Sequence, residues 1–233
     1  MVHSTITKTK DAYNRIAPYF AATRKRLWPE FDQFRPYLRD GQRILDWGCG
    51  SGRMLMFLNR WKGEYYGLDI STELLAMARR NAQEWQPECA VHFLCTASRQ
   101  PSFKANYFDL QFLIASFHHL PTAKTRLALL KKLYSWCKPG GHICITVWNL
   151  DTTWAKETGV KKGWENPSER DFLIPWRDQQ GQEMCKRYYH AFTTEELSGL
   201  VSQAGFMVES VGHGEKQWSD DKGGRNLLLI GKK

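Results

Sequence analysis

Short apolar runs alternate with longer stretches of helical periodicity between residues 44 and 148. The runs predict buried strands, and the stretches between them carry apolar residues at the spacing of amphipathic helices. Strands that alternate with helices of ten or more residues indicate a parallel sheet covered on both faces. The predicted strands are residues 44–46, 65–69, 90–95, 108–116 and 142–148, and the predicted helices are residues 53–61, 71–85 and 122–137.

The carboxyl-terminal part of the chain adds two strands, predicted over residues 206–211 and 226–230, with a turn rich in Gly, Asp and Lys between them. A capping box at Thr193 opens the helix before them, and Gly205 ends it. The chain is therefore predicted to be an α/β protein with a doubly wound, seven-stranded, mostly parallel sheet.

Two segments stand outside this alternation. Residues 1–40 are basic and helical in pattern, with a helix predicted over 11–20 and an amphipathic stretch over 28–38, and form a predicted amino-terminal cap. Residues 151–186 are rich in Trp, Lys, Glu, Asn and Pro and show no period. They predict an insertion after the fifth strand that covers one end of the sheet. A length of 233 residues suits one domain over 1–233.

Composition narrows the class of protein. No apolar run approaches the roughly 18–20 residues that cross a bilayer, and the amino-terminal MVHSTITKTK has no signal-peptide core, so we expect a cytoplasmic protein without a membrane segment. Six cysteines show no C-x-x-C pair, which predicts reduced thiols and no intrinsic metal site.

Positive charge is concentrated in two segments. The chain carries 33 Lys and Arg against 24 Asp and Glu, a formal net charge of +9. Residues 1–43 hold nine basic and four acidic side chains, and the stretch between Asp109 and Asp151 holds five basic and no acidic ones. Clustering of this kind favours contacts to the phosphates of a polyanion, whose affinity falls as salt rises.

The turn after the first strand, residues 46–52, reads Asp-Trp-Gly-Cys-Gly-Ser-Gly. Glycines here let a ligand approach the backbone at the carboxyl end of a strand. The spacing lacks the third glycine of a dinucleotide site, and a carboxylate at Asp46 repels pyrophosphate but attracts a cation. Asp69 ends the second strand, where a carboxylate accepts both hydroxyls of a ribose. Together these groups describe a nucleoside-bearing cation, which fits S-adenosylmethionine.

The core resembles the class I S-adenosylmethionine-dependent methyltransferases, which have a Rossmann-like fold. The likeness rests on ILDWGCGSG, YGLD, FDLQFLIAS and KPGG, in order and spacing. One departure is Thr96-Ala97-Ser98-Arg99 where such enzymes often place an acidic residue for the adenine, so backbone groups or Ser98 must substitute. The resemblance implies that the cofactor-binding residues are Tyr13, Arg24, Asp46, Gly48, Cys49, Gly50, Asp69, Ile70, Ala97, Ser98 and Ser116.

The flanks resemble one family within that class, the eukaryotic-type tRNA wobble-uridine methyltransferases that esterify 5-carboxymethyluridine. The shared pieces are YNRIAPYFAATRKRLWPEF, ASFHHLPT, FLIPW and RYYHAF, over essentially the whole chain. The resemblance implies a methyl ester at the first anticodon position, with the anticodon stem-loop of tRNA as substrate. It also implies a small zinc-containing activator subunit. The third strand, residues 90–95, is an apolar edge on which that subunit would pair.

A carboxylate nucleophile with a pKa of about 4 is ionised at neutral pH and needs no general base. The site must instead hold the carboxylate in line with the methyl group. The candidate donors, which we group as the catalytic residues, are His118, His119, Arg24, Arg187 and His190. Each also has a purely structural interpretation. In it, backbone carbonyls satisfy His118 and His119, Arg24 is a surface charge, Arg187 is a charge at a strand edge, and His190 supports the fold. Tyr188, Tyr189, Trp154, Trp164 and Trp176 are candidates to stack on an unstacked uridine.

Two other functions remain open from the residues alone. One is a methyltransferase for a small-molecule carboxylate or hydroxyl, with the basic charge incidental. The other is a catalytically silent module that binds tRNA or a partner. The intact set of Asp46, Gly48, Gly50 and Asp69 argues against the silent module.

Overall fold

The computed structural model describes residues 2–24, 26–98, 101–150, 152–214 and 226–233, without the side chains of Thr153 and Trp154. The turn expected between the last two strands falls outside these residues. Within them, no helix is long and apolar enough to cross a membrane.

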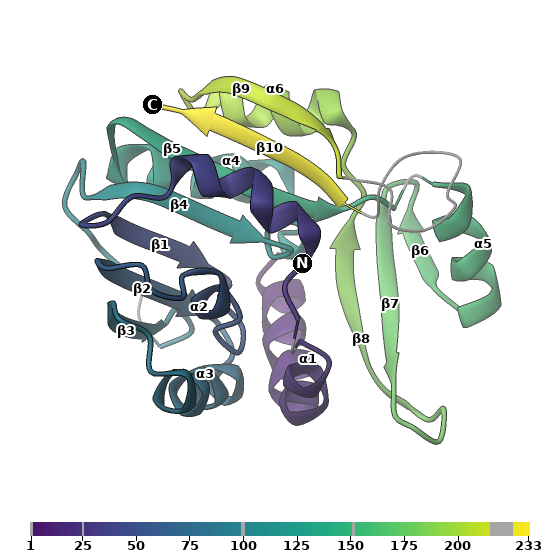
Figure 1. Ribbon diagram of the computed structural model, residues 1–233. Coiled ribbons are helices and arrows are strands. Elements are labelled where there is room, and N and C mark those ends of the chain that lie inside the picture. Colours follow the sequence, from purple (N-terminus) through teal and green to yellow (C-terminus); the bar gives the residue numbers. More distant parts are fainter. Residues whose placement is uncertain (1, 25, 99–100, 151, 215–225) are drawn as a thin grey trace.

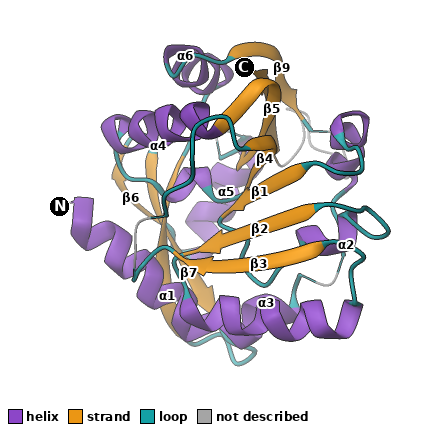
Figure 2. Ribbon diagram, turned by 90° about the vertical axis from the view of Figure 1, so that its left-hand side faces the viewer, coloured by secondary structure: helices purple, strands orange, loops and turns teal. Residues whose placement is uncertain are grey.

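Seven strands form the main sheet in the order β3-β2-β1-β4-β5-β10-β9 (Figure 1). The first five run parallel to one another, and β10 is antiparallel to both of its neighbours. The predicted mostly parallel, seven-stranded sheet is confirmed, and so is the edge position of the third strand (Figure 2). The strands are β1 Arg43–Trp47, β2 Glu64–Asp69, β3 Ala90–Cys95, β4 Phe108–Ile114, β5 Cys137–Trp148, β9 Met207–His213 and β10 Asn226–Lys232.

Helices cover both faces of this sheet. The apolar side chains of α4 and α6 pack on one face, around Leu113 and Ile145. Those of η1, α2 and the end of α3 pack on the other, around Ile44 and Phe112. Because each central strand is buried on both faces, its sequence is a continuous apolar run rather than an alternation. The helices are α2 Met54–Phe57, α3 Thr72–Trp85, η2 Phe117–His119, α4 Ala123–Trp136 and α6 Thr194–Gln203.

The amino-terminal segment forms one long helix and one 3-10 helix. The first, α1 Val2–Ala22, is longer than the helix predicted over residues 11–20. The second, η1 Pro29–Tyr37, contains prolines at both ends, which explains why this amphipathic stretch does not form α-helical hydrogen bonds. Helix α1 packs against α3 and β8, beside the carboxyl ends of β1 and β4 (Figure 1).

The insertion contains regular structure that its sequence pattern did not predict. It comprises α5 Thr153–Lys162 and a three-stranded antiparallel sheet of β6 Glu165–Ser168, β7 Asp171–Arg177 and β8 Glu183–His190. The sheet continues past residue 186, the expected end of the insertion. In β7 the buried Phe172 and Ile174 do alternate with less buried residues, but this period covers too few positions to be recognised between prolines. Figure 1 shows the insertion projecting beyond the carboxyl ends of the parallel strands.

Candidate active site

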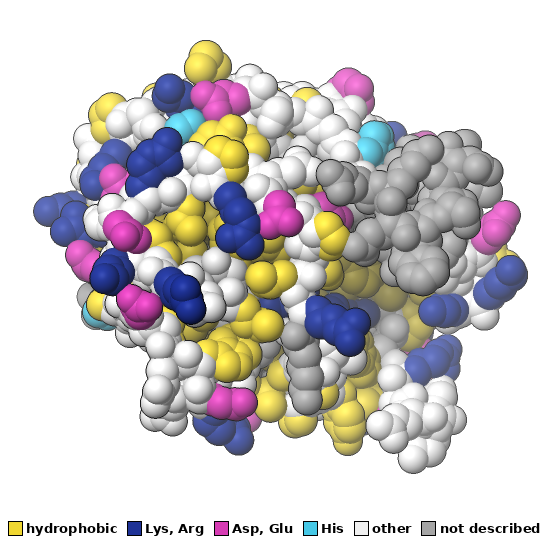
Figure 3. Space-filling view, in the orientation of Figure 1, with side chains coloured by type: hydrophobic (Ala, Val, Ile, Leu, Met, Phe, Trp, Pro, Cys, Tyr) yellow, Lys and Arg dark blue, Asp and Glu magenta, His cyan; other side chains and the backbone are white. Residues whose placement is uncertain are grey.

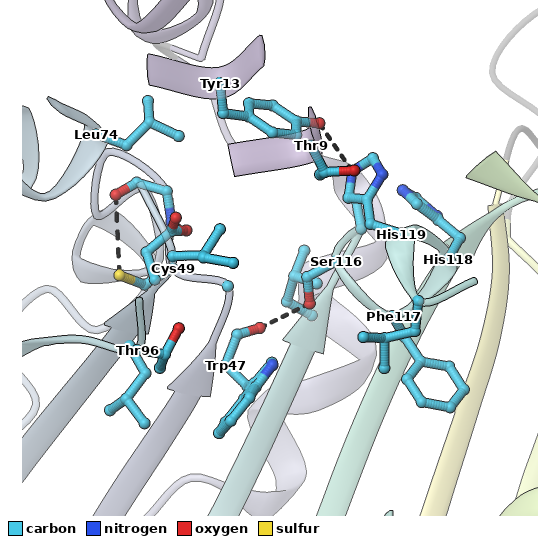
Figure 4. Close-up of a pocket in the computed structure, with 18 of the residues that line it drawn as sticks. Thr9, Tyr13, Trp47, Cys49, Leu74, Thr96, Ser116, Phe117, His118 and His119 are labelled. Atoms are coloured by element: carbon cyan, nitrogen blue, oxygen red, sulfur yellow. Dashed lines mark hydrogen bonds between the residues drawn. The ribbon is translucent and has the colours of Figure 1, made fainter. Parts of the chain in front are cut away.

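A cavity of about 830 Å³ opens at the carboxyl ends of β1, β2 and β4, with α1 as its roof (Figure 4). In a doubly wound sheet this is the edge at which ligands bind, because neighbouring connections leave the sheet toward opposite faces there. Most of the predicted cofactor-binding residues line the cavity: Tyr13, Arg24, Asp46, Gly48, Cys49, Gly50, Asp69, Ile70, Ala97 and Ser116.

The glycine turn is shaped by close contacts with the β4 loop. Gly48 has a φ of +79°, and a Cβ at this position would lie 2.3 Å from Cβ of Ser116. Ser116 in turn donates its hydroxyl hydrogen to the carbonyl of Trp47 at 2.6 Å (Figure 4). Only glycine fits such a position, because an added Cβ meets both an unfavourable backbone conformation and a filled space.

Asp69 fixes the glycine turn to the second strand. Its two carboxylate oxygens accept the backbone N–H groups of Gly50 and Ser71, each at 2.8 Å. Burial raises the pKa of Asp69, and these two hydrogen bonds act in the opposite direction. A carboxylate can accept about four hydrogen bonds, so Asp69 can hold the turn and still accept from a ribose hydroxyl.

Asp46 is a buried carboxylate with one oxygen unused. It is 3% exposed, and Oδ2 accepts the hydroxyl of Tyr65 at 2.7 Å. Oδ1 has no hydrogen-bond partner within the described residues. Burial raises the pKa of Asp46 to about 7. An unsatisfied buried carboxylate is costly by itself, so this position is suited to a ligand with a positive charge.

Two arginines line the cavity near Asp46. The guanidinium of Arg24 lies 4.5 Å from the ring centre of Phe20, and that of Arg53 lies 4.0 Å from the ring centre of Trp28. Across the described residues, no carboxylate comes within the 4.0 Å ion-pair distance of either group. Burial lowers the pKa of both, that of Arg53 to about 10, with Arg24 as a second cause.

Sequence reasoning missed Arg53 and Thr9. Arg53 is the residue directly after the glycine turn, and that position was the available signal. Thr9 lies one helical turn before Tyr13 on α1, so both side chains face the cavity (Figure 4). Its hydroxyl is buried and, within the described residues, has no hydrogen-bond partner.

The two histidines after β4 are neutral and held by specific partners. The Nδ1 of His118 accepts the backbone N–H of Trp148 at 3.1 Å, and burial lowers its pKa well below the ordinary value. The Nδ1 of His119 lies 2.6 Å from the carbonyl oxygen of Tyr188, an acceptor, so this nitrogen carries the proton. The Nε2 of His119 then accepts the hydroxyl of Tyr13 at 2.8 Å (Figure 4). Burial lowers the pKa of His119 to about 3.

The histidines therefore differ from the donors that the sequence suggested. His119 donates only to a backbone carbonyl, and its other nitrogen is an acceptor for Tyr13. His119 lines the cavity and holds the hydroxyl of Tyr13, which lines it as well. His118 keeps its proton on Nε2, because its Nδ1 accepts a hydrogen bond.

Arg187 lies behind the wall of the cavity rather than on its surface. It comes from β8, is 3% exposed and faces the rings of Tyr13, Trp176 and Tyr189 at 5.0–5.9 Å. Its Nε and Nη1 have no hydrogen-bond partner among the described residues. An arginine in these surroundings is stabilised by aromatic faces but keeps donors for an anion.

His190 does not reach the cavity. Its ring nitrogens lie within hydrogen-bond distance of Asp171 at 2.8 Å and of Glu196 at 3.0 Å. Glu196 also pairs with the buried Arg126 at 2.9 Å. With both nitrogens occupied, His190 joins the insertion to α6 and has no ring N–H for a substrate.

The predicted adenine and uridine contacts are only partly assembled. Thr96 and Ala97 line the cavity, whereas Ser98 is outside it and donates to the carbonyl of Cys95 at 3.3 Å. Tyr189 lines the cavity, but Tyr188 hydrogen-bonds to Asp171. The remaining aromatic candidates lie elsewhere: Trp176 beside Phe20 and Arg187, Trp164 against Phe172, and Trp154 outside the described side chains.

The expected positive segments are partly neutralised. Arg126 is buried against Glu196, and Lys138 pairs with Asp109 at 2.6 Å. Lys and Arg side chains are interspersed with Asp and Glu over the face shown in Figure 3. Among the described residues there is no group of three or more metal-ligating side chains, and all six cysteines are free.

Comparison with known proteins agrees with this geometry. Residues 44–141 match the family described as methyltransferase domain. The chain is 32% identical over 164 residues to the tRNA (carboxymethyluridine(34)-5-O)-methyltransferase of Arabidopsis thaliana, covering 70% of this chain and 37% of that protein's length. It is 25% identical over 226 residues to the protein of the same name from Schizosaccharomyces pombe, covering 88% and 91%.

A solved structure has the same fold. A chain of the complex between the Haloferax volcanii Trm112 methyltransferase activator and a methyltransferase aligns with a TM-score of 0.69 at 16% identity, covering 96% of each chain. At this identity the likeness concerns the fold alone. The predicted class I methyltransferase fold is confirmed, residues 44–141 are a methyltransferase domain, and the chain resembles the tRNA (carboxymethyluridine) methyltransferases.

Proposed function

We propose that this chain is an S-adenosylmethionine-dependent tRNA methyltransferase that esterifies the carboxylate of 5-carboxymethyluridine at the anticodon wobble position. The assignment of S-adenosylmethionine as cofactor rests on charged side chains that have no oppositely charged partner among the described residues. Asp46 has a free oxygen, and Arg24 and Arg53 have no carboxylate partner within the described residues. A zwitterionic amino-acid group satisfies both, since its ammonium suits Asp46 and its carboxylate suits an arginine.

The remaining cofactor contacts follow from the same cavity. Asp69 would hold the ribose hydroxyls, and the backbone at Thr96 and Ala97 would border the adenine. S-adenosylmethionine supplies an electrophilic methyl group when bound. The chain's own residues position it: Gly48 lets the backbone approach closely, and Tyr13 and Thr9 cover the cavity from α1.

The observation that carries the acceptor assignment is the buried Arg187, which has no carboxylate partner among the described residues. A buried guanidinium without a carboxylate is costly unless an anion completes it. It lies behind Tyr13 and Tyr189, two rings of the cavity wall, so its positive charge would favour a substrate carboxylate held against this wall. The Arabidopsis and S. pombe relatives are named for a reaction at a carboxymethyl group, which agrees with this assignment.

The chemistry requires no base from the protein. A carboxylate with a pKa of about 4 is already ionised at pH 7. Accordingly, both cavity histidines are neutral, and neither competes for the carboxylate as a cation. The residues instead orient the acceptor oxygen toward the methyl group and exclude water, which is the main contribution available for a methyl transfer.

We further propose that the anticodon stem-loop of tRNA is the substrate and that the protein works in the cytoplasm. Helix α1 and the insertion would frame the entrance, as the cap and cover of a single methyltransferase domain over 1–233. Exposed cations at Lys124 and Lys131 on α4 and at Lys161 and Lys162 on α5 are available for phosphates. Tyr189 would be the ring on which the uridine stacks.

We also propose that a small, zinc-containing activator subunit pairs with the free edge of β3. Among the strands that the structure describes, β3 pairs only with β2, and its Leu94 is 40% exposed. An open apolar edge is a template for strand addition. Soluble, fully active enzyme from expression of this chain alone would contradict this part of the proposal.

The deciding experiment uses labelled S-adenosylmethionine and bulk tRNA, followed by mild alkali. A methyl ester is hydrolysed and the label is released, whereas methyl groups on a base or ribose stay. Label that resists alkali would contradict esterification. Incorporation into small carboxylic acids instead of tRNA would favour a small-molecule methyltransferase. Absence of thermal stabilisation at saturating S-adenosylmethionine would favour a silent binding module.

A further inference from the structure

The N–H donors of Arg53 are not used by the part of the chain that the structure describes. Its guanidinium lies over Trp28 at 4.0 Å and near Phe31 at 5.7 Å from the ring centres. Within the described residues, no carboxylate or carbonyl accepts from its N–H groups. Stacking fixes the plane of a guanidinium while leaving its edge free, and this edge carries the paired N–H donors.

Arg53 lines the cavity, as does Arg24. Both residues line the cavity together with Asp46 and the glycine turn. The two guanidinium groups are close enough for Arg24 to lower the pKa of Arg53, after burial as the main cause. Two cations that repel one another in a partly buried space gain most from an anion placed between them.

We propose that Arg53 is a second cofactor-positioning residue: together with Arg24 it binds the α-carboxylate of S-adenosylmethionine, and it thereby selects against cofactor forms that lack this carboxylate. The proposal rests on the cofactor part of the proposed function and is independent of the methyl acceptor. The α-ammonium then lies toward the free oxygen of Asp46, so that the amino-acid end is held as a zwitterion.

Trp28 acts through Arg53 in this arrangement. It is the residue before η1, and its ring centre lies 4.0 Å from the guanidinium carbon of Arg53. A lysine at position 53 keeps the charge but loses the planar, two-point donor and the stack. We therefore expect Arg53→Lys to keep only part of the preference for S-adenosylmethionine over the form that lacks the carboxylate.

The test compares two ligands that differ only by the carboxylate, S-adenosylmethionine and decarboxylated S-adenosylmethionine, by calorimetric titration without tRNA. For Arg53→Met, the Kd of S-adenosylmethionine should rise about 10- to 100-fold, as expected for loss of charged hydrogen bonds. The Kd of the decarboxylated ligand should change less than about twofold. Arg35→Met is the matched control, because Arg35 also lies over a ring, Phe57 at 5.1 Å, but is exposed and paired with Asp32.

Three results would overturn the proposal. Equal weakening for both ligands means that Arg53 supports only the shape of the turn. Unchanged affinity for both means that it does not contact the cofactor, and a raised KM for tRNA with unchanged cofactor affinity assigns it to the nucleic acid. Wild-type protein that binds neither ligand contradicts the proposed cofactor itself, which separates that failure from this one.

Discussion

Tyr13 on α1 donates its hydroxyl hydrogen to Nε2 of His119 across 2.8 Å, and this bond joins the amino-terminal helix to the loop after β4. The direction follows from the other side of the ring, where Nδ1 donates to the carbonyl of Tyr188 at 2.6 Å. The bond holds the hydroxyl of Tyr13, which lines the cavity, in one orientation.

Tyr13→Phe should lower the free energy of unfolding by about 1–3 kcal/mol, because Nε2 of His119 becomes a buried acceptor without a donor. Tyr19→Phe on the same helix is the control, since Tyr19 is 48% exposed. Urea unfolding measures the difference, and nitrogen NMR of the imidazole reports the tautomer. A signal showing the proton of His119 on Nε2 in the wild-type protein would contradict the assigned direction.

Cofactor affinity should depend on pH through Asp46. Burial raises its pKa to about 7, so the carboxyl is largely protonated below that pH and cannot pair with the cofactor ammonium. Affinity for S-adenosylmethionine should therefore increase from pH 5.5 to pH 8, approaching about tenfold per pH unit well below the pKa. Titrations in this range measure it, and Asp46→Asn should bind weakly with this dependence removed.

The raised pKa of Asp46 also determines how the free energy of unfolding depends on pH. The unfolded carboxyl ionises near pH 4, whereas the folded one stays protonated up to about pH 7. The unfolded state thus binds fewer protons in this window, and the contribution of Asp46 to stability is lost as the pH rises through it. In Asp46→Asn this loss should disappear from the pH profile of urea unfolding.

Gly48→Ala should destabilise the protein by about 2–5 kcal/mol, combining the cost of a positive φ with overpacking. The clash is with Ser116, whose Cβ would lie 2.3 Å from the new methyl group. Gly41→Ala measures the cost of a positive φ alone, because Gly41 has a φ of +82° and nothing within 4 Å of an added Cβ. Equal losses of unfolding free energy in the two variants would show that the Ser116 contact is readily relaxed.

Arg187→Met should lower kcat/KM for tRNA by about 10- to 100-fold while the Kd of S-adenosylmethionine stays constant. The melting temperature should change little, because methionine keeps apolar contact with the three rings and removes a buried charge that has no carboxylate partner among the described residues. Arg177→Met on β7 is the control, since Arg177 is exposed and lies 3.8 Å from Glu183. A fall in melting temperature with unchanged kcat/KM would instead identify Arg187 as a structural residue.

The sheet was predictable because its signals are local. The run over residues 108–116 is apolar because β4 is buried on both faces, and the turn at residues 46–52 is rich in glycine because Gly48 and Gly50 have positive φ. The insertion was not predictable in this way. Its strands are short, and Glu165 to Ser168 are all exposed, so no periodicity distinguishes β6 from a loop.

Some side-chain roles were likewise predictable from the sequence, and others were not. Asp46 and Asp69 were identified because their place at the ends of successive parallel strands determines where they meet. His190 looked like a donor of the site, but its direction on β8 takes it to Asp171 and Glu196. Arg53 was not predicted, because its proposed role depends on the absence of a carboxylate partner among the described residues. That absence is a property of the folded structure around it.

By itself, the sequence determined the order of the strands along the chain, the glycine turn with its two carboxylates, and the likeness to a family of methyltransferases. These depend on burial and backbone conformation, which each short segment expresses in its own residues. Only the tertiary structure decided which nitrogen of His119 faces Tyr13, which arginines lack a carboxylate, and which cations are neutralised inside the protein. Those properties arise between residues distant along the chain, because a proton or a charge takes its state from the groups that folding places beside it.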